Sequence, residues 1–149
     1  MAVVTTIKGE GVFIQIGNGA SPEVFTHPCL INAERGIVFS SNVSSEGVID
    51  CADTDAPAWV ETDIDDLVAT ITGAGKLHLP DQDEFFDWWK SGASKNVKVV
   101  DNTTGANGGQ TYLGAFKLTQ FEKTGARRQR VTASITLVST GPVTRTANA

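Results

Sequence analysis

The chain is poor in the residues on which disulfide-rich scaffolds and metal knuckles depend. Only 2 of its 149 residues are cysteines, Cys29 and Cys51, too few for a disulfide framework and not spaced as a metal-binding knuckle. We expect reduced, partly buried thiols, although the sequence leaves a pairing open. No apolar run approaches the roughly 18–20 residues of a membrane span. The N-terminus has neither the basic nor the apolar segment of a secretory signal, so we expect no membrane anchor and no export.

Positive charge is also scarce. The 12 Lys and Arg residues are outnumbered by 17 Asp and Glu, which gives a net charge of −5 at pH 7. This balance argues against a dedicated duplex-DNA binder, because such proteins carry a basic excess on the binding face. At 149 residues, the chain corresponds to a single domain, 1–149, long enough to bury a sizeable core.

Catalytic and cofactor motifs are missing as well. His27 and His78 have no neighbouring residues that suggest nucleophilic catalysis, and we expect both to be structural. Residues 72–76 depart from a phosphate-binding loop, because Thr70 stands at its first glycine and Leu77 at its Ser/Thr. We therefore expect no enzyme, no catalytic residue, no cofactor and no metal site. A metal-dependent hydrolase built on the dispersed acidic residues remains the weakest alternative.

What the chain does contain is a β-rich pattern of short apolar runs separated by Gly, Asn and Ser clusters. In 129–140, Val131, Ala133, Ile135 and Leu137 alternate with small polar residues, which predicts one buried and one open face. We expect Gly141-Pro142 to end this strand and 141–149 to form a loose C-terminal arm. The expected strands are 12–16, 35–39, 67–79, 96–100, 111–122 and 129–140, with a bend or bulge at Gly73 and Gly75.

One segment, 81–92, has a helical pattern instead. Asp81 and Glu84 have the spacing of a capping box, and Gly92 is a C-terminal stop signal. Phe85, Trp88 and Trp89 recur at helical spacing, so we expect them to form one face that packs on a sheet. An exposed aromatic platform for a ligand is the alternative.

The segment 40–66 shows little regular pattern, and we interpret it as a long extended loop. It has no Lys or Arg, whereas its apolar residues (Val48, Ile49, Trp59 and Ile64) suggest a loop that docks on another surface. Eight acidic residues lie between 46 and 66: Glu46, Asp50, Asp53, Asp55, Glu61, Asp63, Asp65 and Asp66.

A basic patch near the last hairpin has the opposite charge. It contains Lys117, Lys123, Arg127, Arg128 and Arg130, with Glu122 opposing. Such clusters are usually solvated faces, but in a self-assembling protein they can be complementary surfaces between copies. The hypothesis is that the acidic loop, through Asp50, Asp53, Asp55, Trp59, Glu61 and Asp63, contacts Lys123, Arg127, Arg128 and Arg130 of a neighbour.

The chain resembles the major tail tube proteins of long-tailed bacteriophages and of related phage-derived particles such as gene transfer agents. The resemblance spans nearly the whole chain. It rests on the order of several stretches: Gly9–Gly11 with Ile14–Gly19, Phe25–Pro28 to Arg35–Ile37, Asp55–Trp59, Ala69–Gly75, Phe85–Trp89, and Gly114–Phe116 through Val131–Leu137.

The resemblance implies a fold of two packed antiparallel sheets, a β-sandwich or barrel, with one flanking helix. It implies six-subunit rings that stack into a hollow tube through the loop 40–66 and the terminal arms, 1–11 and 141–149. The implied partners are other copies of the chain, tail-tip and tail-terminator proteins, a tape-measure protein in the lumen, and double-stranded DNA passing without specific binding. The implied location is the virion tail, assembled in the bacterial host cytoplasm, with no membrane partner.

A smooth polar lumen lining is also expected, formed by Thr70, Thr72, Thr132, Ser134 and Thr136. The net negative charge suits such a conduit, because tight phosphate binding would slow DNA. Two alternatives to the phage tail tube remain open. They are a tube subunit of a contractile or type VI-like secretion system and a monomeric β-sandwich binding module for a ligand such as a carbohydrate.

Overall fold

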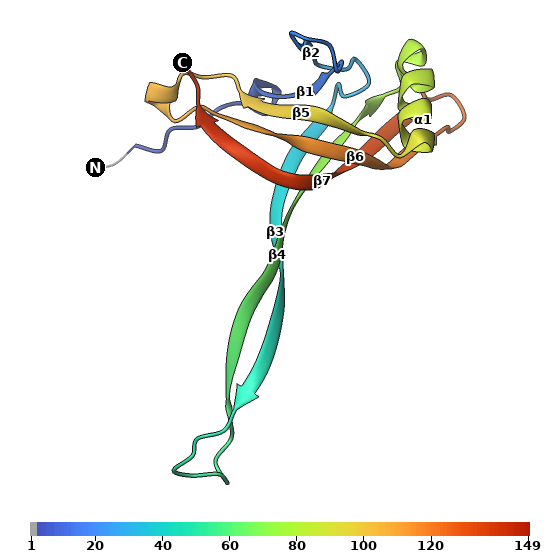
Figure 1. The fold of residues 1–149 in the computed structure, drawn as a ribbon. Helices are drawn as coiled ribbons and strands as arrows, with labels where there is room; N and C mark the ends of the chain where they lie inside the picture. Colours follow the sequence, from blue (N-terminus) through green and yellow to red (C-terminus); the bar gives the residue numbers. More distant parts are fainter. Residues whose placement is uncertain (1–2) are drawn as a thin grey trace.

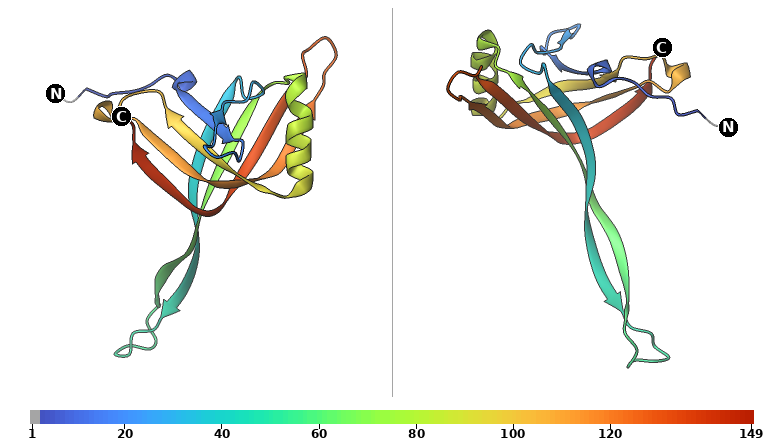
Figure 2. Two further views of the ribbon diagram at one scale, coloured as in Figure 1. Left: turned by 45° about the horizontal axis from the view of Figure 1, so that its top comes forward. Right: turned by 180° about the vertical axis from the view of Figure 1, so that it is seen from behind.

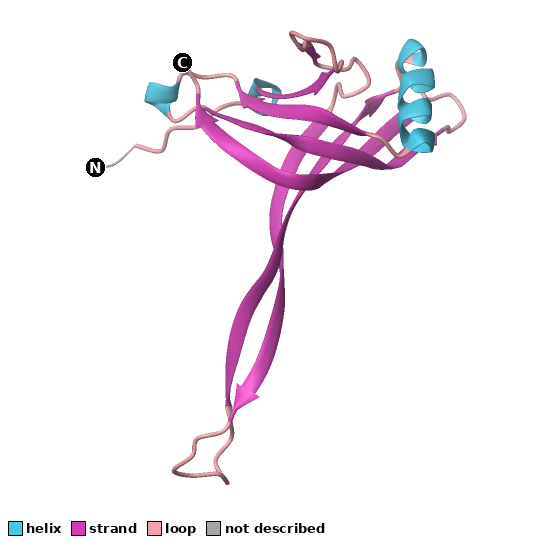
Figure 3. Cartoon of the chain, viewed as in Figure 1, coloured by secondary structure: helices cyan, strands magenta, loops and turns pink. Residues whose placement is uncertain are grey.

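The computed structural model describes residues 3–149, which form one α-helix, seven β-strands and three single-turn 3-10 helices (Figure 1, Figure 3). The mainly β fold with one short helix that the sequence predicts is confirmed. The strands are β1 (Val12–Gly17), β2 (Phe25–Thr26), β3 (Glu34–Val48), β4 (Trp59–Lys76), β5 (Ser94–Asp101), β6 (Gln110–Thr124) and β7 (Thr132–Ala147). The helix α1 spans Gln82–Ser91, and the 3-10 turns are Gly9–Gly11, Leu79–Asp81 and Gly105–Asn107.

All of these strands belong to one antiparallel sheet with the order β2-β1-β5-β6-β7-β4-β3. The sheet curls so that β1 contacts β3 near the other end of this order (Figure 2). The segment between β2 and β3 joins the two, since the ring nitrogens of His27 lie 2.8 Å from the carbonyl oxygens of Ile14 and Ile31. The two expected layers are therefore two halves of one curled sheet, and His27 has a structural position.

The inner face of the curled sheet carries the hydrophobic core. On β7, Ala133, Ile135 and Leu137 are buried as predicted, whereas Val131 precedes the strand and is exposed. Burying a Leu, Ile or Phe side chain contributes about 1.5–3 kcal/mol, so this face accounts for much of the folding free energy. The fully buried side chains are Ile14, Leu30, Ile31, Ile71, Val97, Val99, Phe116, Ile135 and Leu137.

The predicted helix is present, but one of the three residues predicted to pack on the sheet does not do so. Phe85 and Trp88 are buried, and Phe85 stacks on Phe121 of β6 with 6.0 Å between ring centroids. Trp89 is 49% exposed and lies beside Phe86 on the outer side of the helix. Successive helix positions are 100° apart, and here the sheet accepts only the stripe that Phe85 and Trp88 share.

The helix ends also differ in part from the prediction. Gly92 has a φ of +67° and stops the helix as expected. Asp81 makes no capping hydrogen bond to the helix. Its carboxylate instead accepts a hydrogen bond of 3.1 Å from the backbone N–H of Leu30, so it holds the 30–32 segment against the helix start.

The segment 40–66 is not the irregular loop that we expected. β3 and β4 pair from Glu34↔Ala74 to Val48↔Trp59 and form a two-stranded ribbon (residues 40–48 and 59–68) that projects from the body to a tip (residues 49–58) (Figure 1). A bulge between Asn42 and Val43 leaves Asp65 without a cross-strand partner. On the β4 side of the ribbon, Glu61 and Asp63 alternate with Val60, Thr62 and Ile64, the period of a strand.

The prediction that residues 141–149 form a loose C-terminal arm is also wrong. β7 continues to Ala147, which pairs with Gln110 of β6, and Gly141 and Pro142 lie within a register shift opposite Ala115. Gly141 has a φ of +94°, and a bulge is one of the few places where a strand accepts proline. Asn148 holds the strand end by donating hydrogen bonds to the carbonyl oxygens of Asp101 and Thr103.

The glycines in β4 do not produce a bulge, one of the two features expected there. The pairing of β4 with β7 runs without a shift through Gly73↔Ile135 and Gly75↔Ala133. A Cβ atom on Gly75 would lie 2.7 Å from the carbonyl oxygen of Leu30. These glycines therefore provide room for the 30–32 segment to pack on the sheet.

Candidate assembly surfaces

Within residues 3–149, the ribbon is held to the rest of the molecule only at its base. β4 pairs with β7 from Thr70 to Lys76, so residues 59–68 of β4 have only β3 as a neighbour. An isolated two-stranded ribbon is marginally stable in water. The outer edges and both faces of this one are open (Figure 2), which makes the ribbon the natural candidate for contact with another molecule.

The two faces of the ribbon differ in chemistry. Directly paired residues share a face, and the pairs Val43↔Ile64, Ser45↔Thr62 and Gly47↔Val60 make one face apolar or weakly polar. Val43, Val60 and Ile64 are all more than half exposed. This apolar face continues the core-facing side of the sheet beyond the body, through Leu67 at the base of the ribbon.

The other face of the ribbon is acidic. Glu46 and Glu61 are a directly opposed cross-strand pair, and like charges in that position are destabilising. Asn42 donates to Asp66 at 2.6 Å and Ser44 donates to Asp65 at 3.0 Å, which satisfies two of the carboxylates. No Lys or Arg lies between Gly36 and Gly75, so the balancing charge for this face must come from elsewhere.

The tip carries three of the predicted contact residues in a defined turn. Asp50 accepts a hydrogen bond from the N–H of Ala52, and Asp53 accepts one from the N–H of Asp55. Trp59 pairs with Val48 at the end of the ribbon next to the tip, and it is 88% exposed. The structure thus brings Asp50, Asp53, Asp55 and Trp59 to one end of the ribbon, with Glu61 and Asp63 following on its acidic face.

The basic residues lie in the β6–β7 turn (residues 123–130, the basic turn). Arg127, Arg128 and Arg130 are exposed, and Arg128 has a φ of +67°. Lys123 donates a hydrogen bond of 3.1 Å to the side chain of Gln82 at the start of α1. The basic turn lies beside α1, on the body, whereas the tip is at the far end of the ribbon (Figure 1). The acidic and basic clusters therefore do not meet within one chain.

The expected lining residues lie together on the outer face of the sheet. Thr72 pairs directly with Thr136, and the neighbouring pairs place Ser134 opposite Ala74 and Thr132 opposite Lys76. These side chains are partly or fully exposed and none belongs to the core. The structure therefore assembles the five residues into one small, mostly uncharged patch, with Thr70 at its edge.

The structure also describes the cysteines, the groups that could bind a metal ion and the length of the helices. Both cysteines are unpaired and exposed, so the expectation of partly buried thiols is wrong in its burial. Within residues 3–149, no group of three or more His, Cys, Asp or Glu side chains is arranged to hold a metal ion. None of the helices among these residues is long and apolar enough to cross a membrane.

A family model described as phage tail tube protein matches residues 6–145 of the chain. The chain belongs to the phage tail tube protein family. Its role in that family is structural. The family assignment agrees with the resemblance found in the sequence.

Solved tail tube structures share the fold. A subunit from the virion of a native gene transfer agent particle has a TM-score of 0.71 and 18% identity, with 95% of this chain and 100% of that chain covered. The tail of an empty gene transfer agent particle, refined with C6 symmetry, has a TM-score of 0.73 at the same identity and coverage. The SPP1 tail tube has a TM-score of 0.61 and 16% identity, with 96% and 80% covered. No curated protein sequence matches the chain.

Sequence reasoning located the charged residues of this tail tube protein but missed how they are organised. The alternation from Trp59 to Ile64, in which Trp59, Glu61 and Asp63 interleave with Val60, Thr62 and Ile64, is the signal that predicts a strand. The division into an acidic and an apolar face follows from that strand and from its register with β3.

Proposed function

We propose that six copies of this chain close into a ring and that the rings stack into a hollow tail tube that conducts DNA. The observation that carries the proposal is the open ribbon on a chain of the tail tube family. Its apolar face and opposed carboxylates are poorly suited to water alone and well suited to a neighbouring subunit. The C6 symmetry of the related gene transfer agent tail supports the number six.

We further propose that the ribbon is the stacking element and that the basic turn is one of its targets. Charges of opposite sign at the two ends of the molecule favour head-to-tail contact, which generates open stacks. Reversing Arg127 and Arg128 to Glu is then expected to reduce stacking most strongly at low salt, where exposed charges are least screened. Stacking that is unchanged at low salt would remove the basic turn from the contact.

The lumen lining is proposed to be the outer-face patch of Thr70, Thr72, Thr132, Ser134 and Thr136. A Thr72→Cys variant with Cys29 and Cys51 replaced by Ser would be labelled with a biotin maleimide before assembly. In tubes, the labelled site is expected to be inaccessible to streptavidin, whereas a Ser91→Cys control on the helix is expected to remain accessible. Equal streptavidin binding at both sites would place the patch outside the lumen.

In the proposed tail, the tape-measure protein occupies the lumen during assembly, tail-tip and terminator proteins bind the ends, and assembly takes place in the host cytoplasm. No catalytic role or cofactor is part of the proposal. A contractile injection tube is the nearest alternative, since an extracellular contractile injection system subunit has a TM-score of 0.58 and 15% identity. The gene transfer agent structures, with TM-scores of 0.71 and 0.73, favour the phage-type tail.

The test of the tube is negative-stain microscopy of the concentrated protein, combined with size-exclusion chromatography. Rings about six subunits in mass, or stacked hollow tubes, are the expected result. A chain that stays monomeric at all concentrations, even after a tail-tip complex is added as an initiator, would contradict the proposal and favour a monomeric binding module.

A further inference from the structure

Trp59 is the starting observation. It is 88% exposed at the end of the ribbon, on the same face as Val48, and its indole contributes nothing to the core. Tryptophan is the residue type most enriched among interface hot spots, where a few buried aromatic anchors carry most of the binding energy. An indole exposed at the end of a projecting ribbon is therefore well placed to be an anchor.

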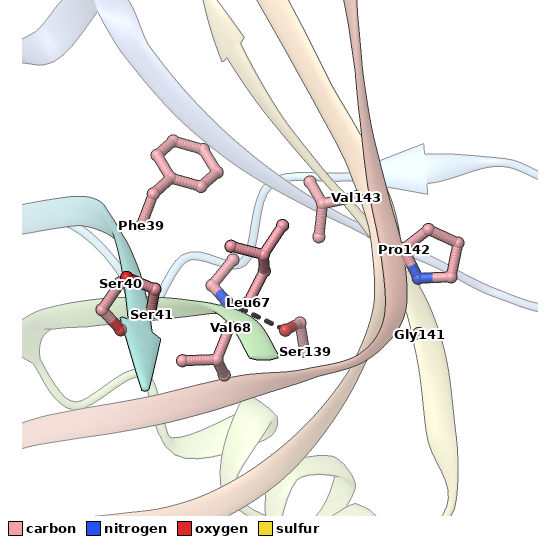
Figure 4. Close-up of a pocket in the computed structure, with 10 residues that line it drawn as sticks. Phe39, Ser40, Ser41, Leu67, Val68, Ser139, Gly141, Pro142 and Val143 are labelled. Atoms are coloured by element: carbon pink, nitrogen blue, oxygen red, sulfur yellow. Dashed lines mark hydrogen bonds between the residues drawn. The ribbon is translucent and has the colours of Figure 1, made fainter. Parts of the chain in front are cut away.

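A cavity of about 410 Å³ lies at the base of the ribbon, in the fork where β4 leaves β7 (Figure 4). Its walls are formed by apolar side chains and small polar ones, and none of its lining residues is charged. The N–H of Ala69 donates a hydrogen bond of 2.9 Å to the hydroxyl of Ser139, which closes the apex of the fork. The apolar lining side chains that define this socket are Phe39, Leu67, Val68, Pro142 and Val143.

The charges around the anchor and the socket are complementary. Trp59 is followed by Glu61 on the same face, and Asp50 lies in the adjacent tip. Beside the socket, Arg145 lines a more open pocket that shares Phe39 and Val143 with it. Arg145 is exposed and makes no ion pair with any residue in 3–149. An indole entering the socket would bring carboxylates toward this guanidinium.

The anchor and the socket cannot meet within one chain. Val48, the partner of Trp59, lies eight positions beyond Ser40 at the socket, and at about 3.3 Å per position this separation is roughly 26 Å. A surface element that complements a pocket elsewhere on the same molecule makes a head-to-tail contact that does not close and so propagates.

We propose that Trp59 of one copy enters the socket of a copy in the next ring, with Arg145 of the second copy facing the carboxylates of the first. This inference rests on the proposed stacking of rings and names the contact that carries it. It adds a second target for the ribbon, distinct from the basic turn.

The first test compares two exposed tryptophans. Trp59→Ala is expected to raise the concentration needed for tube formation at least 30-fold, the effect of losing a hot-spot side chain. Trp89→Ala, at a half-exposed site on the helix, is the matched control and is expected to change it less than about threefold. Both are measured by sedimentation and negative-stain microscopy after circular dichroism has shown an unchanged fold.

The second test uses complementation. Leu67 lines the socket and is 79% exposed, so Leu67→Asp is expected to block the socket without disturbing the core. Rings of Trp59→Ala keep a working socket, and rings of Leu67→Asp keep a working anchor. Neither preparation is expected to stack alone, whereas a mixture is expected to give paired rings that do not extend into tubes.

The outcomes separate this inference from the proposed function. Normal tubes from Trp59→Ala would overturn the anchor while leaving the tube intact. Absence of paired rings in the mixture, while the wild-type chain forms tubes, would overturn the socket. A closed two-chain particle formed by reciprocal exchange would overturn the head-to-tail contact, and a wild-type chain that never forms rings or tubes would overturn both proposals.

Discussion

The packing of α1 gives the sharpest test of the fold, because two adjacent tryptophans should behave differently. Trp88 is 3% exposed, its Nε1–H donates a 2.7 Å hydrogen bond to the carbonyl oxygen of Ala93, and its ring lies against Phe85. Trp89 is 49% exposed and contacts Phe86 on the outer side of the helix. The same substitution to Ala should therefore have very different costs at two neighbouring positions.

The magnitude follows from burial. Truncating a buried aromatic side chain to Ala lowers the free energy of unfolding by about 3–5 kcal/mol, since apolar contact is lost and a cavity remains. The Trp89→Ala change is expected to cost less than about 1 kcal/mol. Trp88→Phe keeps most of the apolar area but loses the hydrogen bond to Ala93, which is expected to cost about 1–2 kcal/mol.

The assay is urea unfolding followed by far-ultraviolet circular dichroism, at protein concentrations where sedimentation shows unassembled chains. With a slope of about 2 kcal/mol per molar urea, Trp88→Ala should lower the midpoint by roughly 2 M, whereas Trp89→Ala should lower it by less than about 0.5 M. Equal midpoints for the two variants, or a larger loss at Trp89, would refute the assignment of the buried helix face.

Further predictions concern the glycine contact, the end of β7 and the ribbon. Gly75→Ala should lower the free energy of unfolding by about 2 kcal/mol or more in the same assay, because its Cβ would press on the 30–32 segment. Asn148→Ala should cost about 1–3 kcal/mol by removing hydrogen bonds to two backbone carbonyls, and an unchanged midpoint would contradict that role. Glu46→Gln should slow amide hydrogen exchange in the ribbon a few-fold at low ionic strength, since it relieves repulsion with the opposed Glu61. Equal exchange rates in the wild-type chain and the Glu46→Gln variant would show that this pair does not weaken the ribbon.

Much of the fold is readable from local patterns. The alternation in β7 identifies Ala133, Ile135 and Leu137 as core residues, and all three are buried. The stop signal at Gly92 works because its left-handed φ of +67° is a local property that glycine tolerates. These predictions succeeded because each depends on a few adjacent residues and not on what the rest of the chain packs against them.

The sequence-based predictions fail where contacts with residues distant in the sequence determine the local structure. Trp89 has helical spacing for the packing face, but only the position of α1 over β6 shows that the sheet covers Phe85 and Trp88 and leaves Trp89 outside. Gly141-Pro142 is an ordinary strand-ending signal, yet β6 continues to pair beyond it through a register shift. Asp81 has capping-box spacing but bonds to Leu30, 51 residues away in the sequence.

The sequence by itself determined the class of the protein: a β-rich chain with one helix, two opposite charge clusters and an ordered set of stretches typical of tail tube proteins. These are properties of composition, local periodicity and order along the chain, and folding does not change them. Only the tertiary structure decided how the clusters are presented. Cross-strand register sorts the ribbon into an acidic and an apolar face. The separation of β4 from β7 at the ribbon base forms the socket, about one ribbon length from Trp59. Both depend on pairings between residues far apart in the sequence, so no local pattern contains them.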